Sequence, residues 1–416
     1  MKNQLKLTFI YLFICLCHSA ANGQSQLKHW YISPYEINVT SSSPAVIPML
    51  GTPPPARQIS NGIYDLNGDL LFYTTVDASQ NYLEVYDRNN NLMGSVGLFY
   101  QGVTSEISIV PAYGNDGCSN NKYYIFTAGT SPVGSVGCTG SEGILNESII
   151  DMNLNSGMGG IASNFVQVDA ICGYENSGIA VGKLHGDQRY IYFSGTNSNI
   201  HGQIDKLILD ASGNVSLSSS FATPTFANFQ TQEMDLSPNG DYLAFANIHS
   251  STLGAGYRYY IIGLDGNGNF INNSYQQFNL NDDPLNQQEE GGRGVEFYQS
   301  GSITKLFIGG GGLGIYSVDI PNVAIQVAVS GSANYGFSQL EMANNNYIYA
   351  GSSDDIGAID PAPSFPVMVP GSNINTVATI IPGSLYPFYC LPDQIDGENY
   401  DNIIPAQVTF DVTSVG

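Results

Sequence analysis

One pattern recurs along the chain: two short apolar strands joined by a tight polar turn. Its clearest copy is Thr231–Asn247, TQEMDLSPNGDYLAFAN, in which Pro238 fixes the backbone φ angle and Gly240 accepts a positive φ. Five further copies lie before and after it at a roughly regular period: Ile63–Tyr73, Ile107–Phe126, Ile179–Phe193, Val295–Ile308 and Leu340–Ala350. The repeat predicts one large closed array of β-hairpins rather than several unrelated domains.

Each hairpin is followed by an apolar strand that ends near Asp or Gly, and then by an outer strand. No segment has a sustained apolar period of 3.6 residues. We therefore expect an all-β chain, a single β-propeller of four-stranded blades that spans residues 24–404, with a short tail at 405–416. Six repeats, plus a composite closing blade made from Lys28–Val39 and Thr376–Ile395, predict seven blades. A six-bladed ring and a split β-sandwich remain as alternatives.

The first residues have the pattern of a secretory signal peptide. Lys2 and Lys6 precede the apolar run Leu7–Cys17, which is too short to span a bilayer, and small residues follow at Ala21-Asn22-Gly23. We expect cleavage after Gly23, which removes residues 1–23 and makes the mature chain secreted, extracellular or attached to the cell surface. A lipoprotein with an acylated Cys in this segment is the weaker alternative. No later stretch predicts a transmembrane segment.

The charge balance is strongly acidic. The chain has 12 Lys and Arg against 35 Asp and Glu, a formal net charge of −23. Nucleic acid is excluded as a partner, because phosphate backbones are bound by clustered cations. The acidity indicates a role in solubility or an attraction for divalent cations.

Four cysteines remain after the predicted cleavage, and in an exported chain they predict two disulfides. Cys118 and Cys138 flank one strand within Gly- and Ser-rich loops, so we expect them to pair, which leaves Cys172 with Cys390. Unpaired thiols are the alternative.

The order of several segments resembles a family of exported Bacteroidetes propellers. The segments are GIYDLNGDLLFYTT, SIIDMNLNSGMGG, DLSPNGDYLAFAN and YCLPDQIDG. The resemblance implies blades of the YVTN and WD40-like repeat type, at the N-terminus of large surface proteins of a gliding-associated secretion system. Nothing after Ile404 has the pattern of a β-sandwich or sorting domain, so the mode of surface attachment stays open. The resemblance brings no catalytic residues.

Motifs that would assign a chemical reaction are incomplete or missing. Asp265-Gly-Asn-Gly-Asn269 begins like a calcium loop, but Phe270 stands where the loop needs Gly, and Gln276 where it needs Glu. We expect a plain turn there and predict no cofactor, with calcium unsupported by a complete motif. No GxSxG elbow or zinc spacing occurs. The motifs therefore leave enzymatic activity open and favour a chain that is not an enzyme.

When the hairpins are overlaid on their turns, six polar residues fall where the innermost strands begin at one mouth of the channel. They are Asn61, Glu106, Asn176, Glu233, Arg293 and Gln339. Such a ring predicts a binding site for a protein or a glycan, and the favoured hypothesis is a binding or adhesion module. The alternatives are a secreted carbohydrate-active enzyme with paired carboxylates at this mouth, and a structural spacer of a larger surface protein. A further alternative is that the six residues have no function. The first residues of strands that line a solvent-filled channel are polar in any case, because they contact water. The oligomeric state stays open.

Overall fold

The structure is a computed structural model of the 416-residue chain. It describes residues 29–32, 35–39, 45–48, 60–65, 69–76, 82–98, 107–113, 119–131, 142–172, 178–196, 202–223, 231–247, 259–280, 294–336, 339–343, 345–351, 355–369 and 374–375. These residues contain no α-helix; two short 3-10 turns occur at Asn155–Gly157 and Gly311–Leu313.

All six predicted hairpins are confirmed as the first two strands of six sheets. The first strands are β4 (Ser60–Tyr64), β8 (Ile107–Tyr113), β12 (Ile179–Val181), β16 (Thr231–Leu236), β20 (Val295–Ser300) and β24 (Leu340–Met342). The second strands are β5 (Leu70–Val76), β9 (Ser119–Ser131), β13 (Arg189–Thr196), β17 (Tyr242–Asn247), β21 (Ile303–Gly309) and β25 (Ile348–Gly351). In β16 and β17 the register places Met234 opposite Phe245 and Leu236 opposite Leu243, which puts apolar side chains on the same face.

Two more strands complete each of these sheets in sequence order. The third strands are β6 (Tyr82–Asp87), β10 (Glu142–Asp151), β14 (Gly202–Leu209), β18 (Tyr259–Gly263), β22 (Ile315–Ile320) and β26 (Asp355–Asp360). The fourth strands are β7 (Leu92–Leu98), β11 (Gly160–Cys172), β15 (Val215–Ala222), β19 (Gln276–Phe278), β23 (Gln326–Ala328) and β27 (Val367–Met368). All neighbours along this order are antiparallel, so these four strands form a meander in each of the six sheets. The all-β prediction is confirmed.

A seventh sheet comes from the N-terminal part of the chain. It consists of β1 (His29–Ile32), β2 (Tyr35–Asn38) and β3 (Ala45–Pro48). The sequence analysis predicted only the part up to Val39, and the Pro-rich segment that follows was expected to be a connector. At the other end, β28 (Ile374–Asn375) pairs with β26. Thr376–Ile395 lies outside the described residues, so the composite closing blade stays a prediction.

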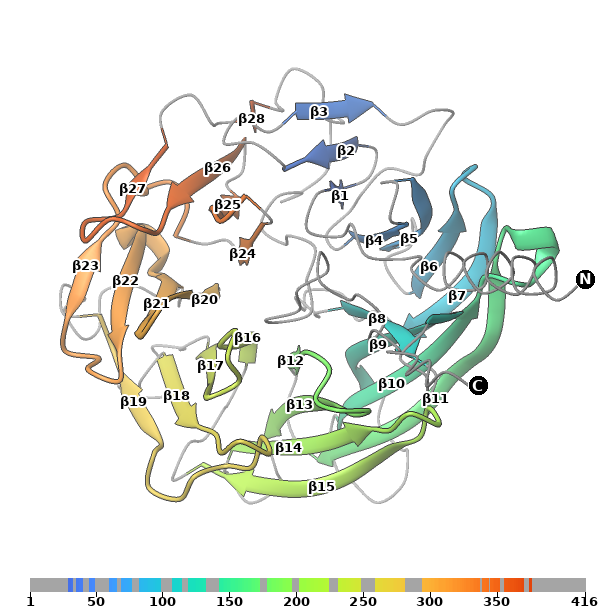
Figure 1. Ribbon diagram of the computed structural model, residues 1–416, viewed down its shortest axis with the longest axis horizontal. Helices are drawn as coiled ribbons and strands as arrows, with labels where there is room; N and C mark the ends of the chain where they lie inside the picture. The colour runs from blue at the N-terminus through green and yellow to red at the C-terminus, as the bar shows by residue number, and fades with distance from the viewer. Residues whose placement is uncertain are drawn as a thin grey trace, which may run out of the picture.

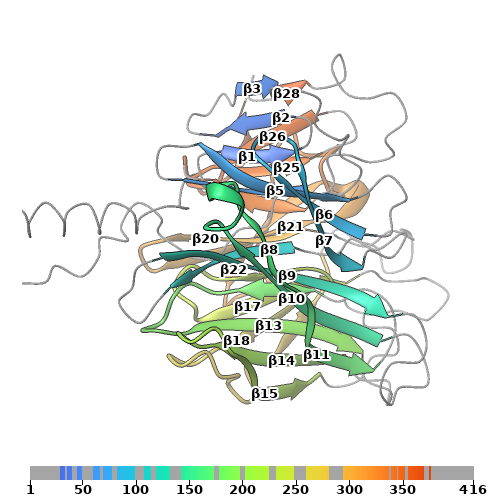
Figure 2. The same cartoon turned by 90° about the vertical axis from the view of Figure 1, so that its right-hand side faces the viewer.

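The sheets stand around a central axis, with the first strands inside and the fourth strands outside (Figure 1). Figure 2 shows the ring from its side, with the strands running roughly along the axis. The core lies between neighbouring sheets, where apolar side chains of each sheet pack on the next. Between the first and last sheets, Trp30 meets Tyr349 edge-on, with ring centroids 5.0 Å apart. The described sheets thus form a closed ring, the arrangement of a β-propeller.

The meander also defines two faces. In each complete sheet the turns between strands one and two, and between strands three and four, lie at the same end. We call this the turn face. The first strands begin at the opposite end, which we call the start face. The predicted ring of polar residues belongs to the start face.

Candidate functional site

Three of the six predicted mouth residues have described side chains, and all three are buried. The exposed fractions are 3% for Asn61, 7% for Glu233 and 6% for Gln339. The Asn61 Nδ2 donates a hydrogen bond to the carbonyl oxygen of Ile107 at 3.0 Å, which joins β4 to β8. The Glu233 Oε2 accepts from the backbone N–H of Val295 at 2.9 Å and from that of Leu340 at 3.4 Å. These side chains join neighbouring inner strands.

Two further carboxylates do the same. The Asp235 Oδ2 accepts from the N–H of Phe297 at 2.6 Å, and the Glu296 Oε2 accepts from the N–H of Met342 at 3.1 Å. Each first strand is the inner edge of its sheet, and an edge strand has N–H groups that no strand ladder satisfies. We call Glu233, Asp235 and Glu296 the tether carboxylates, because each supplies an acceptor to the next first strands. Burial and hydrogen bonding give them a structural role.

The rest of the predicted ring lies outside the described residues. This applies to Glu106, Asn176 and Arg293. Among the cysteines, only the backbone of Cys172 is described, as the last residue of β11; Cys118, Cys138 and Cys390 lie outside. Binding at the channel mouth and disulfide pairing therefore both stay predictions.

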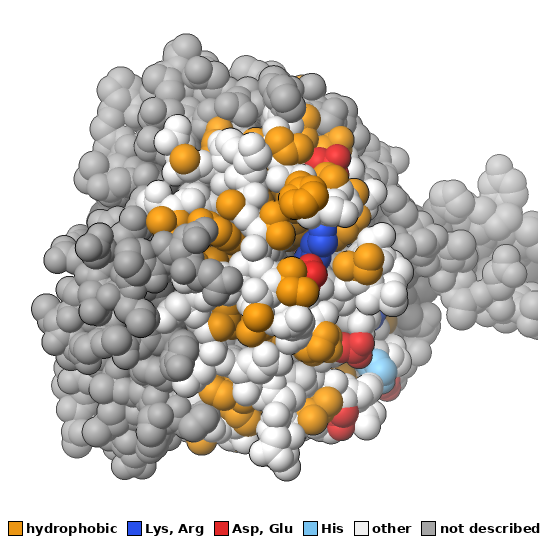
Figure 3. All heavy atoms as spheres, turned by 90° about the vertical axis from the view of Figure 1, so that its left-hand side faces the viewer, with side chains coloured by type: hydrophobic (Ala, Val, Ile, Leu, Met, Phe, Trp, Pro, Cys, Tyr) orange, Lys and Arg blue, Asp and Glu red, His pale blue; other side chains and the backbone are white. Residues whose placement is uncertain are grey.

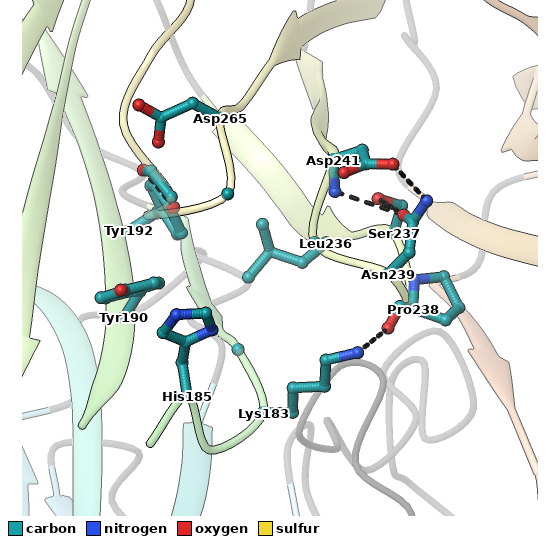
Figure 4. Close-up of a pocket in the computed structure, with 14 residues that line it drawn as sticks. Lys183, His185, Tyr190, Tyr192, Leu236, Ser237, Pro238, Asn239, Asp241 and Asp265 are labelled. Carbon is teal, nitrogen blue, oxygen red and sulfur yellow. Dashed lines mark hydrogen bonds between the residues drawn. The ribbon is translucent and has the colours of Figure 1, made fainter. Parts of the chain in front are cut away.

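A cleft opens on the turn face between the β12–β15 sheet and the β16–β19 sheet. Its volume is about 110 Å³, and it lies where three turns meet: residues 182–188, 237–241 and 265–269. Figure 4 shows Leu236 at its centre, with the rings of Tyr190, Tyr192 and His185 on one side and Asn239 and Asp241 on the other. We call it the inter-sheet cleft.

Strand alternation produces the aromatic wall of the cleft. Ile191 and Phe193 of β13 pack toward the preceding sheet, while Tyr190 and Tyr192 pack toward the β16–β19 sheet. The hydroxyl of Tyr192 donates to the carbonyl oxygen of Gly268 at 2.6 Å. This bond fixes the 265–269 turn against the wall.

Lys206 holds Tyr190 and the same turn together. Its Nζ lies 4.1 Å from the centroid of the Tyr190 ring and donates to the Asn267 carbonyl oxygen at 2.6 Å and to the Asn269 Oδ1 at 2.9 Å. The side chain is 2% exposed, so this ammonium is a buried, hydrogen-bonded charge rather than a surface lysine. Burial lowers the pKa of Lys206, and the neighbouring Asp265 carboxylate opposes that shift.

The opposite wall is a hydrogen-bonded turn. The Ser237 hydroxyl donates to the Asn239 Oδ1 at 2.8 Å and accepts from the N–H of Tyr242 at 2.9 Å. The Asn239 amide nitrogen donates to the Asp241 carboxylate. Lys183 crosses between the sheets, since its Nζ donates to the Pro238 carbonyl oxygen at 2.7 Å. The walls of the cleft are therefore fixed before any ligand arrives.

The Asp265 turn repeats one design of this chain. The Asp265 Oδ1 accepts from the N–H groups of Asn267 and Asn269, and its Oδ2 accepts from the Asn269 side chain at 3.2 Å. Asp210 and Asp87 make the corresponding bonds to Asn214 and Asn91. Hydrogen bonds from the Asn269 backbone, and then from its side chain, lower the pKa of Asp265. Residues 265–269 form a turn, as predicted, and the prediction of no calcium stays a prediction.

The titratable groups of the cleft are mixed in sign. Asp241 and Asp265 supply two carboxylates, while Lys183, Lys206 and His185 supply basic groups. Burial, followed by the charge of Asp265, raises the pKa of Tyr190 and keeps its phenol neutral. The described residues contain no group of three or more His, Cys, Asp or Glu arranged to hold a metal ion. The cleft offers hydrogen-bond donors and acceptors rather than a metal site.

The sequence analysis identified the turns of the cleft but not the cleft. Ser237–Asp241 and Asp265–Asn269 were each interpreted as isolated turns, His185 was considered only as a histidine without zinc spacing, and Lys183 and Tyr190 were assigned no role. One signal was available: in a ring of meanders, the turns between strands one and two and between strands three and four of adjacent units share one face. The choice of interface depends on side-chain packing, which the repeat pattern does not contain.

The fold defines the class of protein, an all-β propeller, and comparisons with known proteins add no family. No family model and no curated protein sequence matches the chain. Solved structures with a similar arrangement include a candidate 6-phosphogluconolactonase from Bacteroides uniformis, with a TM-score of 0.47 and 14% identity, covering 82% of this chain and 92% of that one. An α-L-arabinofuranosidase from Fusarium graminearum has a TM-score of 0.44 and 12% identity, covering 77% and 93%. The nidogen/laminin complex has a TM-score of 0.34 and 9% identity, covering 71% and 92%. Likenesses this distant carry no information on ligand or chemistry.

Proposed function

We propose that this protein is an exported β-propeller that acts as a non-enzymatic binding module at the cell surface, and that its ligand contacts the turn face. The observation that carries the proposal is a contrast in how polar groups are used. The tether carboxylates of the inner strands are buried and accept backbone hydrogen bonds, whereas His185, Asn239, Asp241 and Asp265 are exposed around a preformed cleft. A concave site with converging polar groups is the usual form of a ligand site.

The outer surface supports a polar partner. Figure 3 shows one side of the ring, where apolar side chains are dispersed between polar ones. Phe365, at 77% exposed, is the most exposed of the large apolar side chains that the structure describes. A stable hydrophobic interface needs a larger continuous patch than isolated side chains supply. We infer that recognition uses hydrogen bonds and packing against aromatic side chains. The partner is then a glycan or a polar protein surface.

Export is the second part of the proposal. It depends on the predicted signal peptide of residues 1–23, which lies outside the described residues. No helix in the described part of the chain is long and apolar enough to cross a membrane. The cell-surface setting and the resemblance to exported Bacteroidetes propellers stay predictions.

A carbohydrate-active enzyme is the competing function. It needs two carboxylates, one of which acts on the substrate as acid and the other as base or nucleophile. Glu233 and Asp235 are close in sequence and share one inner strand, but each already accepts a backbone N–H of β20. This arrangement favours a structural role for both.

The test is capture of ligands by the chain that begins at Gln24. Wild-type protein is applied to a glycan array and to a cell-envelope extract, beside the double variant His185→Ala/Asn239→Ala and the control Ser302→Ala, whose exposed hydroxyl lies in the β20–β21 turn. We expect wild type and control to capture the same ligands and the double variant to lose them. Turnover of aryl glycosides by the wild type, lost in Glu233→Gln, would favour the enzyme instead.

A further inference from the structure

The inter-sheet cleft has the chemical features of a site for one sugar ring. We propose that it binds a single neutral pyranose ring at the end of a glycan. This inference rests on the proposed function, because it names the ligand class of the same site. Four observations carry it: the size of the cleft, its apolar surfaces, its hydrogen-bonding groups and its charge balance.

The size favours one ring that is partly enclosed. The cleft volume of about 110 Å³ is well below the roughly 300–1,000 Å³ of pockets that enclose a drug-sized molecule. An elongated ligand cannot be buried here, so only one unit of it enters while the remainder stays in solvent. A terminal ring of a branched or linear glycan meets this condition.

The cleft contains apolar surfaces of the kind that the C–H face of a sugar ring packs against. Leu236 lies at the centre of the cleft, beside the half-buried ring of Tyr190 and the ring of His185, whose centroid is 5.5 Å from that of Tyr190 at a tilt of 32°. An aromatic ring with a polar edge supplies both a packing surface and a hydrogen-bonding group. A sugar ring uses both features, because its C–H face packs on an apolar surface while its hydroxyls form hydrogen bonds.

Both donors and acceptors line this surface. Asp241 and Asp265 accept, while the amide nitrogen of Asn239, the imidazole of His185 and the ammonium of Lys183 donate. Each hydroxyl of a sugar donates one hydrogen bond and accepts others, so it is satisfied by such a mixed set. The walls are held by the Tyr192–Gly268, Lys206–Asn267 and Lys183–Pro238 bonds, which reduces the entropy lost on binding.

The charge balance argues against an ionic ligand. The two carboxylates that line the cleft, Asp241 and Asp265, are matched in number by the ammonium of Lys183, which also lines it, and that of Lys206, which lies behind Tyr190, so the formal charges cancel with His counted as neutral. The whole chain carries a formal charge of −23, which repels sulfated, phosphorylated or sialylated ligands. A cationic ligand would bring a positive charge for which the cleft has no unbalanced carboxylate, because the two carboxylates are already matched by two ammonium groups. A neutral polyol avoids both difficulties.

The experiment is a calorimetric titration of the chain from Gln24. The neutral probes are the methyl pyranosides of glucose, galactose, mannose, fucose and N-acetylglucosamine, and the charged comparators are those of glucuronic acid and glucosamine. We expect at least one neutral probe to bind with a dissociation constant on the order of 1 mM, more tightly than the comparators. His185→Ala and Asn239→Ala should each weaken it about 5- to 10-fold, and Ser302→Ala should leave it unchanged.

The outcomes separate this inference from the proposed function. Tighter binding of a charged comparator, or equal binding by wild type and both cleft variants, would overturn the neutral-sugar site. If every probe fails to bind while the wild type still captures an envelope component through the cleft, the proposal of a sugar site is wrong. The proposal that the protein is a binding module then still stands. If the wild type captures nothing from either the array or the extract, the proposed function fails as well.

Discussion

The inner strands and the inter-sheet cleft both carry acidic and amide side chains, yet the ring uses them differently. On the inner strands, Glu233, Asp235 and Glu296 are buried and accept N–H groups of the next strands. Around the cleft, Asp241 and Asp265 are exposed, and their hydrogen bonds come from their own turns. The first arrangement holds sheets together, and the second shapes a surface. Polarity alone therefore does not mark a binding site in this fold; the identity of the hydrogen-bond partner does.

The largest effect is expected from removing a tether carboxylate. Glu233→Ala leaves the N–H groups of Val295 and Leu340 buried without this acceptor, so we expect the free energy of unfolding to fall by about 2 to 4 kcal/mol. Denaturant unfolding measures it. The exposed Asp187→Ala is the control, with a change within about 0.5 kcal/mol. Equal losses in the two variants would contradict the structural role of Glu233.

A glycine pair tests the packing of the cleft wall. Gly268 and Gly301 both have positive φ angles, +69° and +60°, so an Ala at either is expected to cost about 1 kcal/mol. A Cβ on Gly268 would also stand 2.5 Å from Tyr190 Cδ2 and 2.6 Å from Tyr192 Oη, whereas nothing lies within 4 Å at Gly301. We expect Gly268→Ala to lose about 1 kcal/mol more than Gly301→Ala, and to weaken ligand capture. Thermal unfolding and array binding would show whether the two variants differ.

Two acids outside the tether set, the buried Glu147 and the partly buried Asp169, give a pH prediction. Burial raises the pKa of Glu147 from 4.5 to about 7, and burial followed by the Asp205 charge raises that of Asp169 from 3.8 to about 6. The folded chain then holds protons that the unfolded chain releases, so the contribution of these two groups to stability is fully present below their unfolded pKa values of 3.8 and 4.5 and is lost as pH rises to about 6 and about 7. Glu147→Gln should flatten this fall in melting temperature between pH 5 and pH 8. A slope unchanged by the substitution would contradict the assignment.

The smallest effect on stability is expected at Lys183. Its hydrogen bond to the Pro238 carbonyl oxygen is exposed, so Lys183→Met should change the free energy of unfolding by less than about 0.5 kcal/mol. The same substitution should weaken ligand capture, because the link across the cleft and one donor are lost. Parallel denaturation and capture assays separate the two quantities. Unchanged capture would remove Lys183 from the site.

The sequence was informative where the fold repeats and uninformative where function depends on a single interface. Short apolar runs such as Tyr242–Asn247 predict strands, and Asn-Gly or Pro-Asn-Gly turns fix the hairpin boundaries. Overlaying the hairpins also placed Asn61, Glu233 and Gln339 at equivalent positions near the starts of first strands. It could not show that Glu233 accepts the N–H of Val295, because that bond depends on the distance between two sheets. The cleft depends on the same kind of information, since Tyr190 and Asn239 meet only after the ring has closed.

The central claim is that ligands bind at the inter-sheet cleft and not at the start-face mouth. The direct measurement compares two folded double variants of the chain from Gln24 on the same glycan array and envelope extract. One is the cleft variant His185→Ala/Asn239→Ala, and the other is the mouth variant Glu106→Ala/Arg293→Ala. We predict that the cleft variant loses the ligands captured by the wild type while the mouth variant retains them. Loss in the mouth variant with full retention in the cleft variant would contradict the account.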